Sequence, residues 1–192
     1  MIAMIRFKIA LFFIFNLLIC SKAHAGIVDL NLLYYSESTT ATTAAAGTKT
    51  FYDFCVGFGV YKGNAIVVGW NYASYSSSQT TGTTAVTYTS TQMGPKFIFF
   101  LNKDHNWRIG AAYNITSSAN YQNGANTAET WKGTAYAIDM GYQFLLSDTL
   151  LFGARLNYSI SNYSEKLIGA AYSTTSSSQT FIYPSLGVSY LW

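Results

Sequence analysis

The chain contains 192 residues, of which 50% are hydrophobic and only 10% are charged, and its formal net charge is +3. Soluble globular domains carry about 25% charged residues, and disordered chains combine low hydrophobicity with high net charge. The composition fits neither class and indicates a protein whose surface does not face water alone. A helical membrane protein needs about 20 consecutive apolar residues per span, but after residue 25 the longest such run is residues 97–101.

The first 25 residues have the pattern of a secretory signal peptide. Arg6 and Lys8 precede an apolar stretch at residues 9–19, and the small-residue site Ala-His-Ala follows at residues 23–25. This order of basic, apolar and small residues predicts export and cleavage before Gly26. The organisation we expect is therefore residues 1–25 as a cleaved signal peptide and residues 26–192 as one domain.

Two other interpretations of this segment are weaker. A permanent membrane anchor would need a longer apolar stretch than this one, which also contains Asn16. Lipid attachment at Cys20 would need a small residue before the cysteine, where Ile19 stands.

Cleavage would also remove the excess of positive charge. Arg6, Lys8 and Lys22 belong to the signal segment, so eight of the 11 basic residues remain, which equals the number of acidic residues. Without a basic cluster the mature chain has no electrostatic footprint for nucleic acid, and we expect no such partner. Only Cys55 remains of the two cysteines, so an intramolecular disulfide is not possible.

Apolar residues alternate with small or polar residues along most of the mature chain. The segment from Trp107 is typical, because Trp107, Ile109 and Tyr113 alternate with Arg108 and Asn114. Such a period of two predicts strands with one apolar face and one polar face. Eight segments have this pattern: 27–36, 50–62, 65–76, 86–101, 107–118, 131–146, 150–162 and 180–192.

The connections between these segments alternate in length. Residues 63–64, 102–106 and 147–149 are short turns, whereas 37–49, 77–84, 119–130 and 163–179 are long and rich in Ser and Thr. Short periplasmic turns and long outer loops are typical of outer-membrane barrels. The sequence therefore predicts an all-β fold, an eight-stranded antiparallel up-and-down transmembrane β-barrel in the bacterial outer membrane, with both termini in the periplasm.

The position of the bulky residues favours this interpretation over two soluble β folds. A soluble sandwich buries its apolar face and shows charge outside, and a lipocalin-like barrel is apolar inside. Here the polar positions are occupied mostly by Gly, Ala, Ser and Asn and hold few charges, so the bulky face is expected to point outward. Aromatic residues near both ends of the outward faces would form two interfacial girdles: Tyr34, Tyr52, Tyr72, Tyr113 and Tyr158 at one end, and Phe99, Trp107, Phe144, Phe152 and Trp192 at the other. At Pro95 and Pro184 we expect bulges or weak strand pairing.

The final segment, residues 182–192, resembles the terminal strand of small bacterial outer-membrane β-barrels of the OmpA/OmpX-like type. In that family the last residue is aromatic, usually Phe, and a hydrophobic or aromatic residue stands two positions before it. Here Trp192 and Tyr190 occupy these two positions. The resemblance implies outer-membrane lipid as the surroundings and recognition by the barrel assembly machinery, and it specifies no activity. A monomer is the state that we expect.

The inward faces carry a balanced set of charged side chains. Three acids and three bases are expected to point into the lumen: Asp29, Asp53, Asp139, Lys96, Arg108 and Arg155. The same faces carry the amides of Asn31, Asn71, Gln92, Asn114, Gln143 and Asn157. Because an eight-stranded interior is about wide enough for side chains to fill, the sequence favours a salt-bridged filled lumen, centred on Asp53, Lys96 and Arg155. A narrow passive channel is the alternative.

A catalytic function has little support in the sequence. Outer-membrane barrel enzymes need a general base, often His, near the outer rim, but the one mature histidine, His105, lies in a turn expected in the periplasm. The rim acids Glu37, Glu129 and Glu165 belong to three different loops. We expect no catalytic residue, no cofactor and no metal site, with a lipid-modifying enzyme as a distant alternative.

The predicted outer loops could serve as spacers or as a binding surface. They are almost uncharged, and Ser-Ser-Ser-Gln-Thr occurs twice, at residues 76–80 and 176–180. Such composition is typical of filler, but loops on a rigid scaffold commonly bind partners. Tyr121, Tyr163 and Tyr172 would supply the contacts to a surface ligand.

Overall fold

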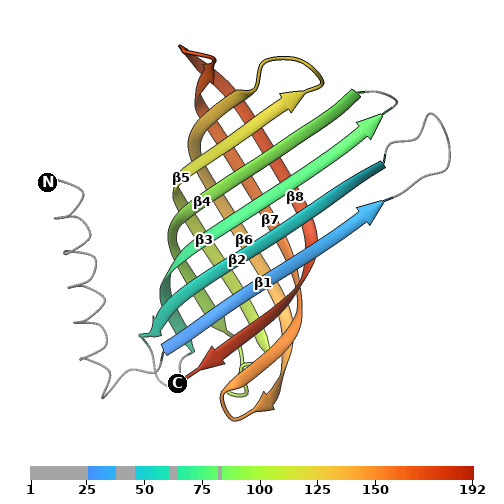
Figure 1. Ribbon diagram of the computed structural model, residues 1–192. Coiled ribbons are helices and arrows are strands. Elements are labelled where there is room, and N and C mark those ends of the chain that lie inside the picture. The colour runs from blue at the N-terminus through green and yellow to red at the C-terminus, as the bar shows by residue number, and fades with distance from the viewer. Residues whose placement is uncertain (1–25, 38–45, 61–64, 82–83) are drawn as a thin grey trace, which may run out of the picture.

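The computed structural model describes residues 26–37, 46–60, 65–81 and 84–192. Within them eight strands follow one another: β1 (Gly26–Glu37), β2 (Ala46–Gly59), β3 (Ile66–Thr81), β4 (Thr84–Phe100), β5 (Trp107–Asn123), β6 (Glu129–Ser147), β7 (Leu150–Ile168) and β8 (Ala171–Leu191). Each strand pairs antiparallel with the next, and β8 pairs with β1. The predicted eight-stranded antiparallel barrel is therefore confirmed (Figure 1).

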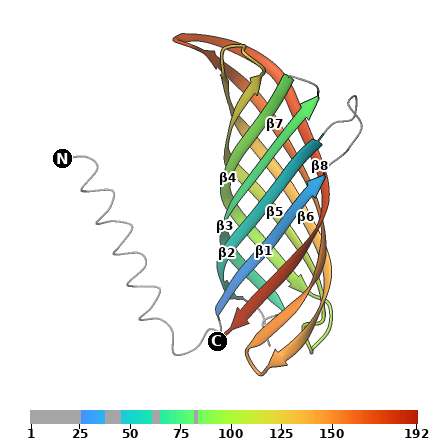
Figure 2. The same ribbon diagram turned by 45° about the vertical axis from the view of Figure 1, so that its right-hand side comes forward.

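The two ends of the barrel differ. One end holds Gly26, the C-terminus, the last residues of β2, β4 and β6 and the first residues of β3, β5 and β7, and we call it the turn end (Figure 1). The opposite end holds the last residues of β1, β3, β5 and β7 and the first residues of β2, β4, β6 and β8, and we call it the hairpin end. The β7 and β8 strands rise farthest there (Figure 2). The signal peptide predicted for residues 1–25 lies outside the described residues, and β1 begins at Gly26.

The strands are longer at the hairpin end than the sequence predicts. β7 continues to Ile168 and β8 starts at Ala171, so most of the loop expected at residues 163–179 is strand. β3 likewise continues to Thr81, and β5 to Asn123. The interpretation of these segments as long loops is wrong, because Ser and Thr pair well in a sheet whose two faces are both wet, where no apolar period of two marks the strand.

Side chains alternate between the two faces of the barrel wall. Along β4 exposed and buried residues alternate over most of the strand. In the half of the strand nearer the turn end the exposed positions are apolar, as Met93, Phe97 and Phe99 show, whereas the buried ones include Gln92 and Lys96. This arrangement is the reverse of a soluble barrel and gives the outer wall the apolar surface that a bilayer requires.

The two strand prolines lie at irregular places in the pairing. The β4 to β5 register shifts between Met93 and Lys96, which confirms the bulge expected at Pro95. Pro184 pairs in register with Leu156 of β7, so no bulge forms there. On its other side, however, the ladder between β1 and β8 runs only from Ile27 to Leu32, opposite Leu191 to Leu186, and Pro184 lies beyond its end.

Candidate functional site in the lumen

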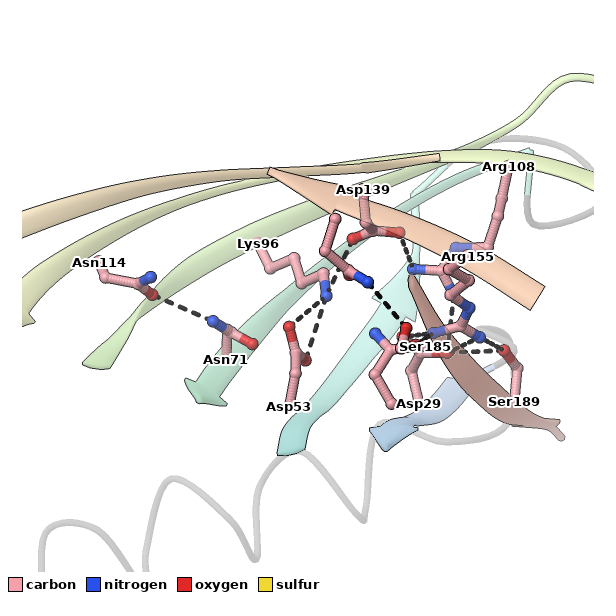
Figure 3. Close-up of polar contacts among 12 residues, drawn as sticks. Asp29, Asp53, Asn71, Lys96, Arg108, Asn114, Asp139, Arg155, Ser185 and Ser189 are labelled. Atoms are coloured by element: carbon pink, nitrogen blue, oxygen red, sulfur yellow. Dashed lines mark hydrogen bonds and ion pairs between the residues drawn. The ribbon is translucent and has the colours of Figure 1, made fainter. Parts of the chain in front are cut away.

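Six ionisable side chains from six strands meet in the middle of the lumen (Figure 3). None of them is more than 5% exposed. They are Asp29 on β1, Asp53 on β2, Lys96 on β4, Arg108 on β5, Asp139 on β6 and Arg155 on β7. These are the residues that alternation assigns to the lumen.

The six groups form one chain of alternating charge. Lys96 Nζ lies 2.9 Å from Asp53 Oδ2 and 3.2 Å from Asp139 Oδ2. Arg108 continues the chain, with Nη2 3.0 Å from Asp139 Oδ1 and Nη1 2.7 Å from Asp29 Oδ1. Each internal member therefore has two partners of opposite sign.

Arg155 closes the chain at its far end. Its guanidinium donates to both carboxylate oxygens of Asp29, at 2.9 Å and 2.8 Å, and also to Asn31 and Ser189. Arg155 belongs to the same cluster as Asp53 and Lys96 but reaches them only through the other members of the chain, because Asp29 is its ion-pair partner. Strand order alone could not show this, since every strand reaches the centre of so narrow a barrel.

The buried charge balances within the cluster. Three carboxylates face three cations, and a buried ion without a partner would cost several kcal/mol. Good geometry and further hydrogen bonds are what make such burial tolerable. The Ser189 hydroxyl supplies one of them, donating to Asp29 Oδ1 at 2.6 Å.

Neutral amides extend the polar network along the lumen. Asn71 and Asn114 lie 3.1 Å apart, Asn114 donates to Gln92 at 3.0 Å, and Gln92 donates to Ser161 at 2.9 Å. All six amide residues expected in the lumen are buried: Asn31, Asn71, Gln92, Asn114, Gln143 and Asn157. Their dipoles fill the space around the charges with directed hydrogen bonds.

Toward the hairpin end the lumen is filled by aromatic rings, which the sequence analysis missed. The buried rings of this aromatic layer are Phe51, Tyr75, Tyr88, Trp131, Tyr163 and Tyr183, with Phe181 packed against them. Tyr88 and Tyr163 share a hydrogen bond between their hydroxyls. The assignment of Tyr163 to a surface loop is wrong, since it is 2% exposed and faces the lumen. Counting in twos from the lumenal charges, as from Asp53 to Phe51, would have found part of this layer.

Toward the turn end an apolar layer lies beneath the charges. Its members are Ile27, Cys55, Val67, Ile98, Phe100, Leu151 and Leu191. Several stand two positions from a polar lumenal residue on the same strand, as Ile27 does from Asp29 and Ile98 from Lys96. Cys55 is a free, buried thiol in this layer. The charged cluster therefore has apolar side chains on both sides along the barrel axis.

The space left inside these layers is small. A cavity of about 20 Å³ lies between the charged cluster and the aromatic layer, lined among others by Asp53, Asp139 and Tyr183. A water molecule needs at least about 10 to 15 Å³ by the same measure. The cavity therefore has room for about one water.

The girdle residues named above lie on the outer wall. Tyr34, Tyr52, Tyr113, Tyr158, Phe99, Trp107, Phe144 and Trp192 are exposed, and Tyr72 and Phe152 are half-buried. Neighbouring members meet across strands, as Tyr52 and Tyr72 do in a tilted arrangement with ring centroids 6.1 Å apart. At the C-terminus the Trp192 ring stacks on Tyr190 at 6.1 Å, and the Trp192 carbonyl accepts from the Gly26 amide at 2.8 Å.

The hairpin end carries one partly exposed ion pair. Lys166 Nζ lies 2.8 Å from Glu129 Oε1, and the Trp131 indole donates to Glu129 Oε2 at 2.8 Å. The hydrogen bond from Lys166 holds the pKa of the Glu129 carboxyl below its usual value. Nearby, Tyr121 stacks on Trp131 at 5.2 Å, while Tyr172 is exposed with Lys132 5.8 Å from its ring centre.

The described part of the chain contains no group of three or more His, Cys, Asp and Glu side chains that could hold a metal ion. His105 lies in the turn between β4 and β5, with φ of 58°, and its ring meets Phe100 edge-on at 4.6 Å. Its carbonyl accepts from Gln143 at 3.0 Å. Among the described residues there is no helix long and apolar enough to span a bilayer.

Comparison of the backbone with solved structures finds membrane barrels. Neisserial surface protein A aligns over 87% of this chain and 96% of its own, with a TM-score of 0.51 and 12% identity. The chain has the fold of a small outer-membrane β-barrel. The attachment invasion locus protein Ail of Yersinia pestis follows, with a TM-score of 0.43, 12% identity, and coverage of 88% of this chain and 97% of its own. No protein-family model and no curated protein matches the sequence.

Proposed function

We propose that this protein is a non-catalytic integral protein of the bacterial outer membrane with a filled, non-conducting lumen. The observation that supports this best is the layered interior, in which a balanced charged cluster has apolar or aromatic packing on both sides. The barrel is a rigid support in the membrane, and its extended hairpin end is the part available to partners outside the cell. Residues 1–25 direct export and are removed.

The outer wall supports the membrane location. Large apolar side chains stand exposed around it, among them Leu32, Trp70, Ile115, Ile138 and Leu186, and in water such a surface would aggregate. A closed ladder leaves few backbone groups unpaired in hydrocarbon. We place the turn end and both termini in the periplasm, because short connections face that side in outer-membrane barrels.

A passive channel fits these observations less well. Ions would have to cross both the aromatic layer and the apolar layer, whose buried members are uncharged rings and small or aliphatic side chains. They would also have to pass Lys96 and Arg108, which are 1% exposed and held on two sides by carboxylates. Opening the lumen would therefore break several charged contacts at once.

Single-channel recording tests the proposal. Residues 26–192 are refolded into lipid, the folded barrel is verified, and current is measured across a planar bilayer. We expect no discrete conductance steps. Reproducible steps that Asp53→Ala alters, but that the outward Ile138→Ala does not, would contradict the filled lumen and assign the charged cluster to the wall of a pore.

A further inference from the structure

The barrel is closed unevenly, and its shortest ladder, between β1 and β8, stops beside the aromatic layer. The ladder between β1 and β8 ends at Leu32 and Leu186, whereas the β7 to β8 ladder continues from there to Ala171. Beyond this point β1 and β8 do not pair with each other. Among the described residues, no ladder joins Leu33–Glu37 of β1 to the part of β8 before Leu186. We call this interval the open seam.

Aromatic stacking spans the open seam where backbone pairing stops. Phe51 of β2 lies 4.4 Å from Tyr183 of β8 between ring centres, and Tyr75 of β3 lies 4.0 Å from Phe181 of β8. Phe181 is only half-buried, and the strand that carries it is held by β7 alone. Its side chain can therefore swing away without breaking a ladder hydrogen bond to β1.

Behind these rings lies the small cavity, which is lined by both aromatic and polar side chains. Phe51, Tyr75, Phe181 and Tyr183 form its aromatic side, while Gln92, Asn157 and Ser159 are among its polar residues. Ser159 is 5% exposed, and its hydroxyl has no hydrogen-bond partner within the described part of the chain. A buried hydroxyl without a partner costs free energy, which a ligand atom in the cavity could recover.

We propose that this cavity is a binding site for a small aromatic molecule that carries one hydroxyl or carbonyl group. The ligand ring takes the position of the Phe181 side chain against Tyr75, and its polar atom hydrogen-bonds to Ser159 Oγ. Because the cavity of about 20 Å³ has room for about one water, Phe181 moves into the open seam when the ligand enters. Engineered apolar cavities that bind benzene measure about 150 Å³, a space that displacement of a whole ring supplies.

Amide NMR of the labelled barrel in lipid nanodiscs tests the site, with p-cresol as the probe and toluene as the probe without a hydroxyl. We expect saturable shifts at Ser159, Phe181 and Tyr183 with p-cresol and weaker binding of toluene. Probe that merely partitions into the bilayer shifts the amide resonances of lipid-facing residues such as Ile115, and these shifts do not saturate. Ile115 therefore serves as the internal reference. Shifts at Phe181 that only follow those at Ile115 would overturn the proposal.

Two variants separate the two parts of the site. Ser159→Ala should weaken p-cresol about fivefold, the equivalent of one hydrogen bond, and leave toluene unchanged. Phe181→Ala should strengthen both probes several-fold, because the space no longer has to be opened. Ser117→Ala is the matched control, since its buried hydroxyl also lacks a partner but lies away from this cavity. Equal effects of Ser159→Ala and Ser117→Ala would contradict the role of Ser159.

Discussion

Arg155 on β7 donates to both oxygens of the Asp29 carboxylate on β1, although the two residues are 126 positions apart. The pair spans β8, whose own ladder with β1 is the shortest in the barrel. Ser189 of β8 donates to the same carboxylate at 2.6 Å. Side chains from three strands thus reinforce the junction at which the sheet closes.

Loss of the contact between Arg155 and Asp29 should destabilise the barrel. Arg155→Ala should lower the free energy of unfolding by about 3 to 5 kcal/mol, because it removes one partner of a buried ion pair. Urea unfolding of the barrel in lipid measures the change. Lys166→Ala is the control, since its pair with Glu129 is partly exposed and such pairs contribute about 0 to 1 kcal/mol. Equal losses in the free energy of unfolding would show that the buried pair contributes no more to stability than the partly exposed one.

The Arg155 guanidinium occupies the space beside Gly187. A Cβ atom added at Gly187 would collide with the Arg155 guanidinium. Because several hydrogen bonds hold that group, Gly187→Ala should destabilise the barrel by about 1 to 3 kcal/mol, the usual cost of overpacking. The neighbouring outward variant Val188→Ala is the control. A urea midpoint for Gly187→Ala no lower than that for Val188→Ala would show that Arg155 relaxes easily.

The Tyr88 and Tyr163 hydroxyls should be energetically coupled. Tyr88→Phe or Tyr163→Phe alone should cost about 1 kcal/mol, because each removes a buried hydrogen bond and leaves the other hydroxyl without this partner. The double variant should cost less than the sum of the two single variants. A double-mutant cycle in urea measures the coupling, and strict additivity would show that the two rings act independently.

Protonation should release the ion pair at the hairpin end. The pKa of Glu129 is lowered by the hydrogen bond from Lys166. Because the folded-state pKa lies below the unfolded one, the pair stabilises the rim above the unfolded pKa, and this stability is lost as the pH falls through the folded value. The carboxyl carbon of Glu129 should therefore titrate below the usual 4.5 in ¹³C NMR. In Lys166→Ala its midpoint should rise toward that value, and an unchanged midpoint would assign the shift to another cause.

The terminal ring should matter for assembly more than for the finished barrel. Trp192 stacks on Tyr190 and faces outward, and the resemblance at this end implies recognition by the assembly machinery. Trp192→Phe should preserve the rate of assisted folding into lipid, while Trp192→Ala should slow it. Unassisted refolding is the comparison, and an equal slowing in both assays would assign the effect to packing instead.

Much of the fold could be predicted from the sequence, because the bilayer imposes a strict rule on each strand. Where one face meets lipid, every second residue must be apolar. From this rule the eight strands, their direction and the charged residues of the lumen could be predicted. The rule ends where the wall leaves the lipid. Above Ile160 and Ile182 the next outward residues of β7 and β8 are polar, among them Asn162 and Thr180, so no apolar period of two distinguishes strand from loop there.

The partners within the lumen could not be predicted in the same way. Alternation assigns Arg155 and Asp53 to the same interior, but strand tilt and register decide that Arg155 meets Asp29. The aromatic layer is not marked by the apolar period of two, because aromatic residues stand on both faces of the wall, as buried Phe51 and exposed Tyr52 show. Tyr183 stands two residues before Ser185, and both are buried.

The order of the charged contacts restricts the route by which the barrel can form. The chain of ion pairs runs through β2, β4, β6, β5, β1 and β7, so no half of the sheet contains it complete, and the pair between β1 and β7 spans the closing strand β8. A half-formed sheet inserted into hydrocarbon would present unpaired ions, each at a cost of about 2.5 to 3.5 kcal/mol near the bilayer centre. We therefore expect partly inserted species to be poorly populated, with insertion and closure in one cooperative step.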